Sequence, residues 1–512
     1  MKSVNRKWIW VILLLAGVSL ACRLTSPTPA SWSGTPSAEA RNATNTAFAL
    51  TQDAKTVRET QTPTAAQTAT TAPLTPTAKS TAAVDGPWLV YPAADAKGLV
   101  AYDLDAQVMI EIPLPEPIII SDLACGLAPD GHTLVIRAGS EYNTDELGIY
   151  QIDLPSGTVT QLTPLLSITN QRKLLNEEGS RVFQTLAAVT REDGLAWSPD
   201  GHYLAFIAAL EYNSADLYVL DVEKGRIERL NGVYSQSASP FWSPGSNWLV
   251  TQELGDFTTE TGWRSEAVSG LRFPGYDGQN TLYLPAKGSV EEVFLGWANA
   301  QSFLSYSRTP AGMTALRQVD VDTLSVGMIY ADDFSLAAFD PASGALTLVL
   351  DETQALEQGK ISGVYLRKPE SAAFELQQAG AWASLAWDPS GVFVASGRQG
   401  VSVITPDGKA ILLTGESGLS VSPSGNWMVG WGDGDSKASG ARLYQSPSGN
   451  LLQSLTDLQV TSVYWQPDSK AFFLLAEGTL YRVAFPGLNL EEITSGYPAG
   501  QSLEMIWVEP EK

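Results

Sequence analysis

The chain has 512 residues, of which 17% are charged and 9% are aromatic, and it contains 44 glycines and 30 prolines. This composition is typical of many short apolar strands joined by tight turns. The net charge of −23 argues against sequence-independent binding to nucleic acid or anionic lipid, because both require clustered lysine and arginine. The two cysteines, Cys22 and Cys125, are too few for a disulfide framework or a cysteine-rich metal site.

The N-terminus has the order of a secretion signal. Three basic residues precede an apolar segment of 13 residues, Trp8 to Leu20, and Ser-Leu-Ala-Cys ends at Cys22. This order resembles a bacterial lipoprotein signal peptide with its lipobox, although Ser19 stands where leucine is usual. The resemblance implies a signal peptide over 1–21, lipidation of Cys22, and a location outside the cytoplasm on the bacterial cell surface. An uncleaved anchor is the alternative, but a bilayer core needs about 20 apolar residues.

Residues 22–84 are dominated by threonine, alanine, proline and serine, as in TPTAAQTATTAPLTPTA (62–78). Such a segment has too few large apolar side chains to bury a core. As a flexible coil of this length it would span roughly 45 Å. The sequence therefore predicts a disordered stalk that links the signal peptide to one folded domain over 85–512.

From Trp88 onward one pattern recurs, and LAWSPDGHYLAF (195–206) is its best copy. A strand ends at the tryptophan, proline and glycine reverse the chain, and a second strand returns. Two further strands follow in most copies. The other copies begin near residues 127, 241, 295, 336, 385, 419 and 463. Their spacing, mostly near 45 residues, predicts four-stranded propeller blades.

This pattern resembles the WD40-like (PD40) repeats of TolB-type and prolyl-oligopeptidase-type propellers, and it implies an all-β fold with a single β-propeller. Residues 88–112 suit the second to fourth strands of one blade, and SLEMIWV (502–508) suits its missing first strand. N- and C-terminal strands would then close the ring and remove its exposed sheet edges. The weak copies at 295 and 336 are expected to share a blade, which predicts eight blades, with seven as the alternative.

No catalytic motif is found. His132 and His202 both follow Asp-Gly in the same turn of two repeats, which indicates a structural role, and no Gly-x-Ser-x-Gly elbow is present. No residues remain for a separate hydrolase domain, and the turns lack the spacing of a sialidase Asp-box. Asp433 and Asp435 are weak candidates for calcium, because the spacing of a calcium loop is absent. We expect no cofactor, no metal and no enzymatic activity, and we expect Cys125 to be buried.

Two repeats carry Glu-Tyr-Asn after their second strand, and these residues are the candidate ligand contacts: Glu141, Tyr142, Asn143, Glu211, Tyr212 and Asn213. Three insertions, 165–192, 253–278 and 433–440, occupy equivalent positions. Because successive strands are antiparallel, these segments should share one rim, here called the insertion rim. The Ser-Pro-Asp-Gly turns should lie on the opposite rim, here called the turn rim. The alternative to ligand contact is that Tyr142 and Tyr212 cover apolar blade edges.

These features predict a monomeric propeller held on the membrane through its N-terminal lipid alone. It would be a non-catalytic scaffold that binds an extracellular or envelope protein or a glycan through the insertion rim, and it would not bind nucleic acid. One alternative is a hydrolase or lyase that acts on polysaccharide with carboxylates of the same rim. Another is a TolB-like envelope assembly factor, although a stalk replaces the α/β domain that TolB-type proteins carry.

Overall fold

The computed structural model of the chain describes residues 87–509, except for some short segments. Those segments are 96, 141–145, 155, 171–180, 212–213, 231–235, 259–261, 274–281, 287–289, 310–311, 433–439 and 499. The predicted signal peptide, the predicted stalk and Cys22 lie outside the described residues. Within the part of the chain that is described, no helix is long and apolar enough to cross a bilayer.

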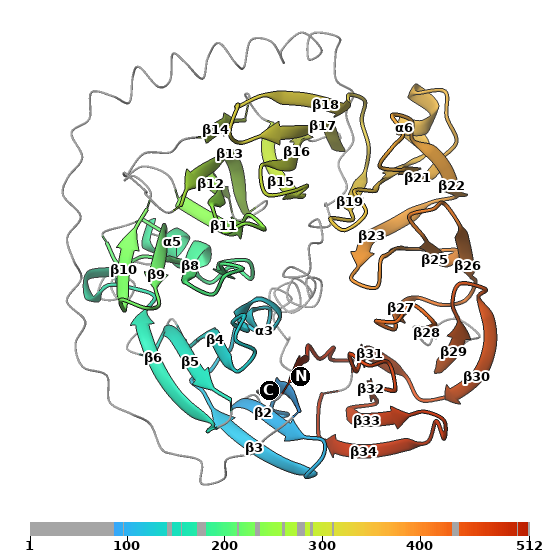
Figure 1. Cartoon of the computed structure of the whole chain (residues 1–512), viewed down its shortest axis with the longest axis horizontal. Helices are drawn as coiled ribbons and strands as arrows, with labels where there is room; N and C mark the ends of the chain where they lie inside the picture. Colours follow the sequence, from blue (N-terminus) through green and yellow to red (C-terminus); the bar gives the residue numbers. More distant parts are fainter. Residues whose placement is uncertain are drawn as a thin grey trace, which may run out of the picture.

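The described strands form nine antiparallel sheets that follow one another around a central axis (Figure 1). The chain is therefore a β-propeller built mainly from four-stranded blades, as the repeats predict. From inner to outer strand, blade 1 is β35 (Ile506–Val508), β1 (Trp88–Pro92), β2 (Gly98–Asp103) and β3 (Val108–Pro113); blade 2 is β4 (Thr133–Ala138), β5 (Gly148–Asp153) and β6 (Thr158–Pro164); blade 3 is β7 (Leu195–Trp197), β8 (Tyr203–Ala208), β9 (Asp216–Asp221) and β10 (Arg226–Arg229). Blade 4 is β11 (Gln236–Trp242), β12 (Trp248–Thr258), β13 (Gly262–Arg272) and β14 (Leu282–Pro285); blade 5 is β15 (Glu291–Trp297), β16 (Ser302–Thr309), β17 (Gly312–Asp320) and β18 (Val326–Tyr330).

The remaining blades follow the same order. Blade 6 is β19 (Leu336–Phe339), β20 (Leu346–Leu350), β21 (Gly363–Arg367) and β22 (Glu375–Ala379); blade 7 is β23 (Trp382–Asp388), β24 (Val392–Gly397), β25 (Gly400–Ile404) and β26 (Ala410–Leu413). Blade 8 is β27 (Gly418–Val421), β28 (Trp427–Trp431), β29 (Ala441–Gln445) and β30 (Asn450–Thr456); blade 9 is β31 (Val460–Trp465), β32 (Ala471–Ala476), β33 (Thr479–Ala484) and β34 (Leu490–Ser495). Among the described residues, three helices interrupt this order: α3 (Asp122–Gly126), α5 (Arg181–Val189) and α6 (Glu352–Glu357).

The prediction of eight blades, with seven as the alternative, is wrong. The copies at 295 and 336 do not share a blade, because each contributes to its own four-stranded sheet. Strands β15 to β18 occupy residues 291–330, and β19 to β22 occupy residues 336–379. The strands in these two repeats are short and their turns are tight, so four strands fit within each repeat. Each weak copy of the pattern therefore forms a complete blade.

The predicted closure of the ring is confirmed. β35 pairs antiparallel with β1, and the partners are Trp88 with Val508, Leu89 with Trp507, and Val90 with Ile506. The start of β1 and the end of β35 therefore lie side by side. A strand from the C-terminal end thus covers the inner edge of β1, which would otherwise be unpaired.

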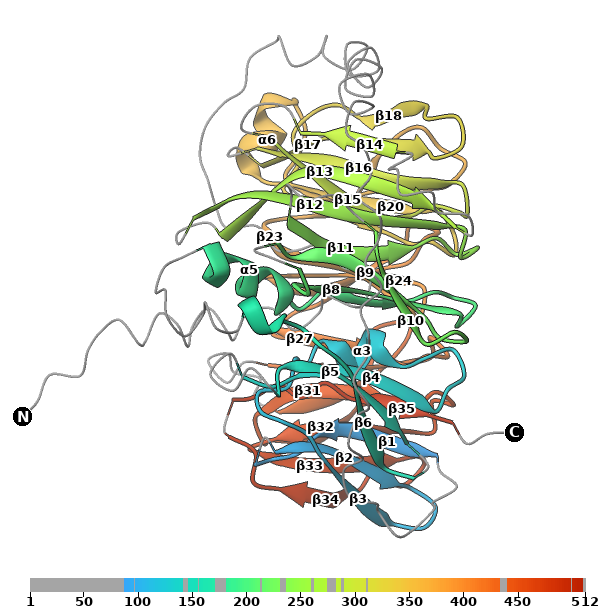
Figure 2. The same cartoon turned by 90° about the vertical axis from the view of Figure 1, so that its left-hand side faces the viewer.

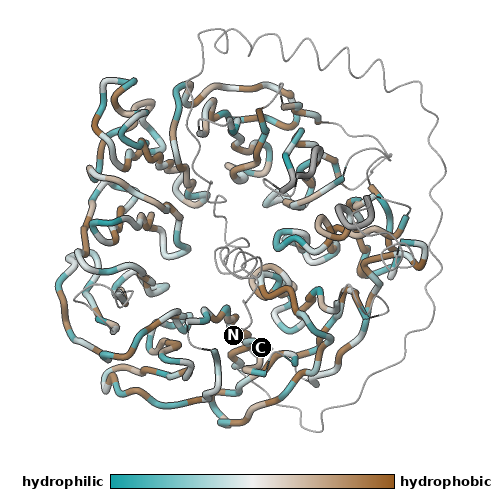
Figure 3. The backbone as a smooth tube through the Cα atoms, turned by 180° about the vertical axis from the view of Figure 1, so that it is seen from behind, coloured by the Kyte–Doolittle hydropathy of each residue, from teal (hydrophilic) through white to brown (hydrophobic). Residues whose placement is uncertain are grey.

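The repeated tryptophan connects neighbouring blades. Its indole N–H donates to a backbone carbonyl of the preceding blade in three successive blades. These bonds run from Trp197 to Gly126 (2.8 Å), from Trp242 to Ala196 (3.2 Å) and from Trp297 to Phe241 (3.3 Å). Apolar residues recur along the strands of every blade (Figure 3), and they pack against the adjacent sheet, as Phe241 stacks on Phe294 with ring centroids 4.3 Å apart. The motif thus stabilises the contact between blades.

The Asp-Gly-His turns are held by hydrogen bonds between a side chain and the backbone. Asp130 and Asp200 each accept a hydrogen bond from the backbone N–H two residues further on, that of His132 at 2.9 Å and that of His202 at 3.1 Å. The glycines between them have φ of +79° and +75°, which residues other than glycine rarely adopt. The carboxylates therefore stabilise the turns.

Blade 2 has three strands because α3 takes the place of an inner strand. The inner edge of β4 is covered by isolated bridges from Leu127 to Leu134 and from Ile118 to Ala138. Between them, the carboxylate of Asp122 on α3 accepts the backbone N–H of Arg137 over 2.8 Å. A side chain thus replaces a strand as the hydrogen-bond partner of this edge.

The additions to the blades that the structure describes gather on one rim. Two of them, α5 and the hairpin of β12 and β13, belong to predicted insertions, whereas α6 was not predicted. Residues 433–439 of the third predicted insertion lie outside the described residues. α5 precedes the inner strand of blade 3, α6 follows the second strand of blade 6, and the hairpin of β12 and β13 extends beyond its blade. Figure 2 shows these three elements on the same side of the ring, opposite the side where the described chain ends. The 253–278 insertion is thus partly strand, since the pairing of β12 with β13 continues to Thr258 and Gly262.

Candidate functional site

Of the six predicted ligand contacts, the structure describes Glu211. The other five lie outside the described residues: Glu141, Tyr142, Asn143, Tyr212 and Asn213. The calcium candidates Asp433 and Asp435 also lie outside them. Cys125 was expected to be buried, but it is partly exposed on α3. The reason is that α3 occupies the inner position of blade 2, where one side of a short helix faces the axis (Figure 1).

Glu211 lies after β8, where ionic and hydrogen-bonding contacts hold it. Arg229 Nη1 lies 2.5 Å from Glu211 Oε2, and Arg229 Nη2 lies 2.9 Å from Asp216 Oδ2. Asn170 Nδ2 donates to the carbonyl oxygen of Glu211 over 2.7 Å. Burial raises the pKa of Asp216 to about 6, although Arg229 opposes this rise. Glu211 therefore anchors its loop to the blade, and its carboxylate is already paired.

A buried ion pair that the sequence did not predict joins blades 2 and 3. Asp122 and Arg137 have fully buried side chains, and Arg137 Nη2 and Nε donate to the two carboxylate oxygens over 2.7 and 2.9 Å. Arg137 Nη1 donates to the carbonyl of Val189 in α5 over 2.9 Å. Arg137 Nη2 also donates to the carbonyl of Glu192 over 3.2 Å. One guanidinium thus fixes the segment that leads into β7.

Three charged residues lie directly before β7, at the end of the inner strand that faces the insertion rim. Arg191 Nη2 and Nε donate to the two carboxylate oxygens of Asp193 over 3.0 and 3.1 Å. Ser239 on β11 of the next blade donates to the same carboxylate. Oε2 of Glu192 is buried and has no hydrogen-bond partner among the described residues. We call Arg191, Glu192, Asp193 and Ser239 the β7 entry cluster.

The two carboxyl groups of this cluster have pKa values that shift in opposite directions. Burial and repulsion by Asp193 raise the pKa of Glu192. Burial also opposes ionisation of Asp193, but the charge of Arg191 and hydrogen bonds from Arg191 and Ser239 outweigh it and lower its pKa to about 2. Carboxyl groups with separated pKa values can serve as an acid and an ionised base. The β7 entry cluster is therefore the described site with the clearest potential for acid–base chemistry.

The Asp193 pairing predicts a pH-dependent contribution to stability. Its pKa is lower in the folded chain than the usual 3.8, so its contribution is present above pH 4 and is lost as pH falls towards 2. We expect Asp193→Asn to lower the free energy of unfolding by about 2 kcal/mol at neutral pH. Urea unfolding from pH 7 to pH 2 measures this difference, which should shrink below pH 4. If the variant loses as much free energy of unfolding at pH 2 as at pH 7, the proposed lowering of the pKa of Asp193 by its partners is contradicted.

Other carboxylates near the starts of inner strands are also paired with arginine. Glu292 on β15 is buried, and Arg317 Nη2 on β17 lies 2.6 Å from its Oε2. Glu416, just before β27, binds Nε and Nη2 of Arg442 on β29, each over 2.6 Å. Both pairs therefore bridge strands of one blade, and the carboxylates are engaged in structural contacts.

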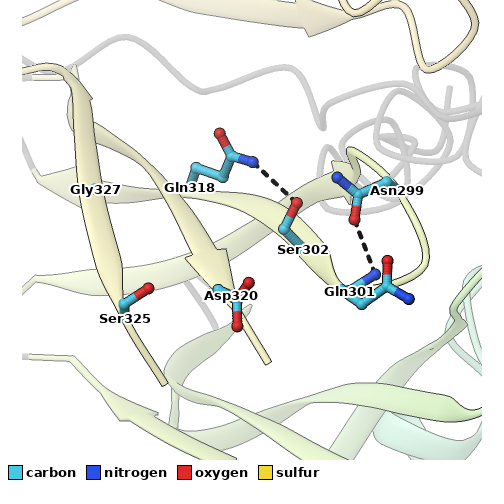
Figure 4. Close-up of a pocket in the computed structure, with 7 residues that line it drawn as sticks. All are labelled: Asn299, Gln301, Ser302, Gln318, Asp320, Ser325 and Gly327. Atoms are coloured by element: carbon cyan, nitrogen blue, oxygen red, sulfur yellow. Dashed lines mark hydrogen bonds between the residues drawn. The ribbon is translucent and has the colours of Figure 1, made fainter. Parts of the chain in front are cut away.

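A polar pocket of about 470 Å³ lies on blade 5 near the turn between β15 and β16. It is lined by Asn299, Gln301, Ser302, Gln318, Asp320, Ser325 and Gly327 (Figure 4). Two of these side chains contact each other, because the amide Nε2 of Gln318 donates to Ser302 Oγ over 2.9 Å. Because the β15–β16 and β17–β18 turns contribute its lining, the pocket belongs to the turn rim and not to the rim predicted to bind a ligand.

The sequence carried only a weak signal for the β7 entry cluster. Arg191, Glu192 and Asp193 are adjacent charged residues just before a predicted inner strand, in a chain where only 17% of residues are charged. Their partners could not be read from the sequence, because Arg137 is 55 residues from Glu192, and Ser239 is 46 residues from Asp193. Among the described residues, no group of three or more histidine, cysteine, aspartate or glutamate side chains is arranged to hold a metal ion.

Comparisons with known proteins show the fold. No protein-family profile matches the chain. A segment of 61 residues is 43% identical to the uncharacterized peptidase YuxL of Bacillus subtilis, and it covers 12% of this chain and 9% of that peptidase. A crystal structure of the eukaryotic initiation factor is similar with a TM-score of 0.50 at 12% identity, over 83% of this chain and 99% of that one.

Two enzymes are also among the similar structures. Oligogalacturonate lyase in complex with manganese has a TM-score of 0.37 at 14% identity, over 86% of this chain and 97% of the lyase. Dipeptidyl peptidase 4 of Porphyromonas gingivalis has a TM-score of 0.43 at 11% identity, over 72% of this chain and 59% of the peptidase. At these identities and TM-scores the likeness carries no conclusion about activity, and the expectation that the chain is not an enzyme stays a prediction.

Proposed function

We propose that the chain is a propeller scaffold, tethered outside the cytoplasm through a lipid on Cys22, that binds an extracellular or envelope protein or a glycan without chemical turnover. The observation that carries this proposal is the gathering of α5, α6 and the β12–β13 hairpin on one rim (Figure 2). Loops and insertions on a rigid scaffold are where propellers bind their partners. The carboxylates of Glu211, Glu292 and Glu416 are engaged by arginine, which supports a structural role for them.

The β12–β13 hairpin offers a sharp test of this rim. Gly255 pairs with Arg264, so residues 256–263 can be replaced by Asn-Gly, which forms a two-residue turn between paired strands. We expect the shortened full chain, reconstituted in phosphatidylcholine nanodiscs, to lose at least about tenfold in affinity for its ligand, because the contact area shrinks. Glycan arrays and purified envelope proteins supply the ligands for this measurement.

The control is His132→Ala with His202→Ala, which alters the turn rim and should leave binding unchanged. Binding that survives the shortened hairpin but is lost in the histidine variant would overturn the assignment of the insertion rim. Failure of every glycan and envelope protein to bind the unmodified chain would overturn the scaffold proposal.

A second candidate is an enzyme that acts on polysaccharide, and the separated pKa values of Glu192 and Asp193 favour it. Glu192 would be the proton donor, and Asp193 would remain ionised beside Arg191. The same screen distinguishes the two candidates, because turnover of a glycan that is lost in Glu192→Gln would support the enzyme and contradict the scaffold.

A further inference from the structure

The insertion rim presents large apolar side chains to solvent at α6. Leu356 on this helix is 81% exposed, and Ile361, which follows the helix, is 60% exposed. The outer strand β30 carries a less exposed pair, Leu451 at 54% and Leu452 at 48%. Exposed apolar side chains that gather at one place mark interaction sites more often than scattered ones.

The exposed leucine lies on a rigid support, because α6 is capped at both ends. Asp351 and Gln354 form a capping box at the N-terminus. At the C-terminus, Gly359 has φ of +63°, its N–H donates to the carbonyl of Leu356, and the N–H of Lys360 donates to the carbonyl of Ala355. This is a Schellman motif. A partner that binds Leu356 would therefore meet a side chain on an ordered helix, which lowers the entropic cost of association.

Exposed acidic side chains lie on the same helix as Leu356 and on the neighbouring segment after β18. Glu352 and Glu357 are exposed on α6 itself, and Asp332 is exposed beside Tyr330. None of these carboxylates forms an ion pair with a described residue. The nearby cation is already engaged, because Lys360 Nζ lies 4.9 Å from the ring centroid of Tyr330 and donates to its hydroxyl over 2.9 Å. We call Leu356, Ile361, Glu352, Glu357 and Asp332 the α6 patch; it is apolar at its centre and acidic at its edge.

We propose that the α6 patch docks a protein segment that carries an apolar anchor flanked by lysine or arginine. This inference rests on the proposed function, because it names the kind of partner that the insertion rim would bind. A second copy of the chain would bring two acidic edges together, and an anionic lipid surface would repel the patch in the same way. A basic segment is attracted by the carboxylates, while Leu356 and Ile361 bury apolar area against its anchor.

The test uses a fluorescent amphipathic peptide of about 18 residues, with leucine on one helical face and lysine on the other. Fluorescence anisotropy measures its binding to the full chain in phosphatidylcholine nanodiscs, with empty nanodiscs as the background. We expect Leu356→Ser with Ile361→Ser to weaken binding by at least about tenfold, because the anchor contact is lost. Leu451→Ser with Leu452→Ser is the matched control and should change binding less than about twofold.

The carboxylates are tested separately, in a variant that leaves the apolar pair intact. Glu352→Gln with Glu357→Gln should weaken binding by about fivefold at low salt, and the difference should disappear near 0.5 M salt, where charges are screened. These exposed substitutions should leave the melting temperature unchanged. The variant with altered carboxylates also keeps the test decisive if the serine variant does not fold.

Three outcomes of the peptide assay would overturn the inference. The first is equal loss of binding in the α6 variant and the β30 control, which would indicate non-specific adsorption. The second is equal binding of a peptide in which glutamate replaces every lysine, and the third is unchanged binding in both α6 variants. If the hairpin variant loses its ligand while both α6 variants keep it, the scaffold proposal stands and the α6 inference alone fails. If the ligand is a glycan whose binding needs neither Leu356 nor Ile361, the inference fails as well.

Discussion

Deleting residues 502–512 is expected to prevent the propeller from folding. The deletion removes β35 and four buried apolar side chains, Leu503, Met505, Ile506 and Val508. Burial of each contributes about 1.5–3 kcal/mol, so their sum is comparable with the whole stability of a typical domain. The deletion also exposes the inner edge of β1, which favours aggregation. The chain should accumulate in the insoluble fraction, and any soluble part should lack a cooperative thermal transition.

The matched control removes residues 509–512 and keeps β35 intact. That shorter deletion should leave both the soluble yield and the melting temperature unchanged, because Val508 and its pairing with Trp88 remain. A cooperative transition near that of the unmodified chain after removal of 502–512 would show that blade 1 does not need its closing strand.

Replacing Asp122 by alanine is expected to lower the free energy of unfolding by about 3–5 kcal/mol, because it leaves the buried Arg137 without a counter-charge. The change also removes the acceptor for the backbone N–H of Arg137, which no inner strand satisfies in blade 2. Urea unfolding followed by tryptophan fluorescence measures the loss as a shift of the midpoint.

The double variant Asp122→Leu with Arg137→Met serves as the control for this mechanism. It removes both charges and keeps apolar volume, so it should be less destabilising than Asp122→Ala alone. If the loss of stability in the double variant instead equals the sum of the losses in Asp122→Leu alone and Arg137→Met alone, the loss arises from packing and not from an unpaired charge.

The architecture could be predicted from the sequence because it repeats. Most copies of the Trp-Ser-Pro-Asp-Gly pattern mark a strand, a turn and a second strand, and the apolar segment 502–508 supplied the missing strand of blade 1. The position of the insertion rim also followed from the alternation of strand direction. These inferences depend on local patterns and on chain order, which a single sequence contains.

The number of blades and the charged contacts could not be predicted in the same way. The copy at 336 departs from the pattern, as LAAFDPASGALTLVL has no tryptophan, yet its alternating apolar residues still form β19 and β20. The pairing of Asp122 with Arg137 depends on α3 replacing a strand, and the β7 entry cluster depends on residues from two neighbouring blades. Such contacts follow from the packing of distant segments, which no local pattern encodes.

The position of the two ends of the described chain has a practical consequence for presentation of the protein. Because the start of β1 and the end of β35 are paired on the turn rim, a fluorescent protein or an affinity tag fused after residue 512 is joined to the ring at the face opposite α5, α6 and the long hairpin. Attachment through residues before Pro87 reaches the ring at the same face. Immobilisation by either end thus orients the insertion rim away from the support, towards the surrounding medium.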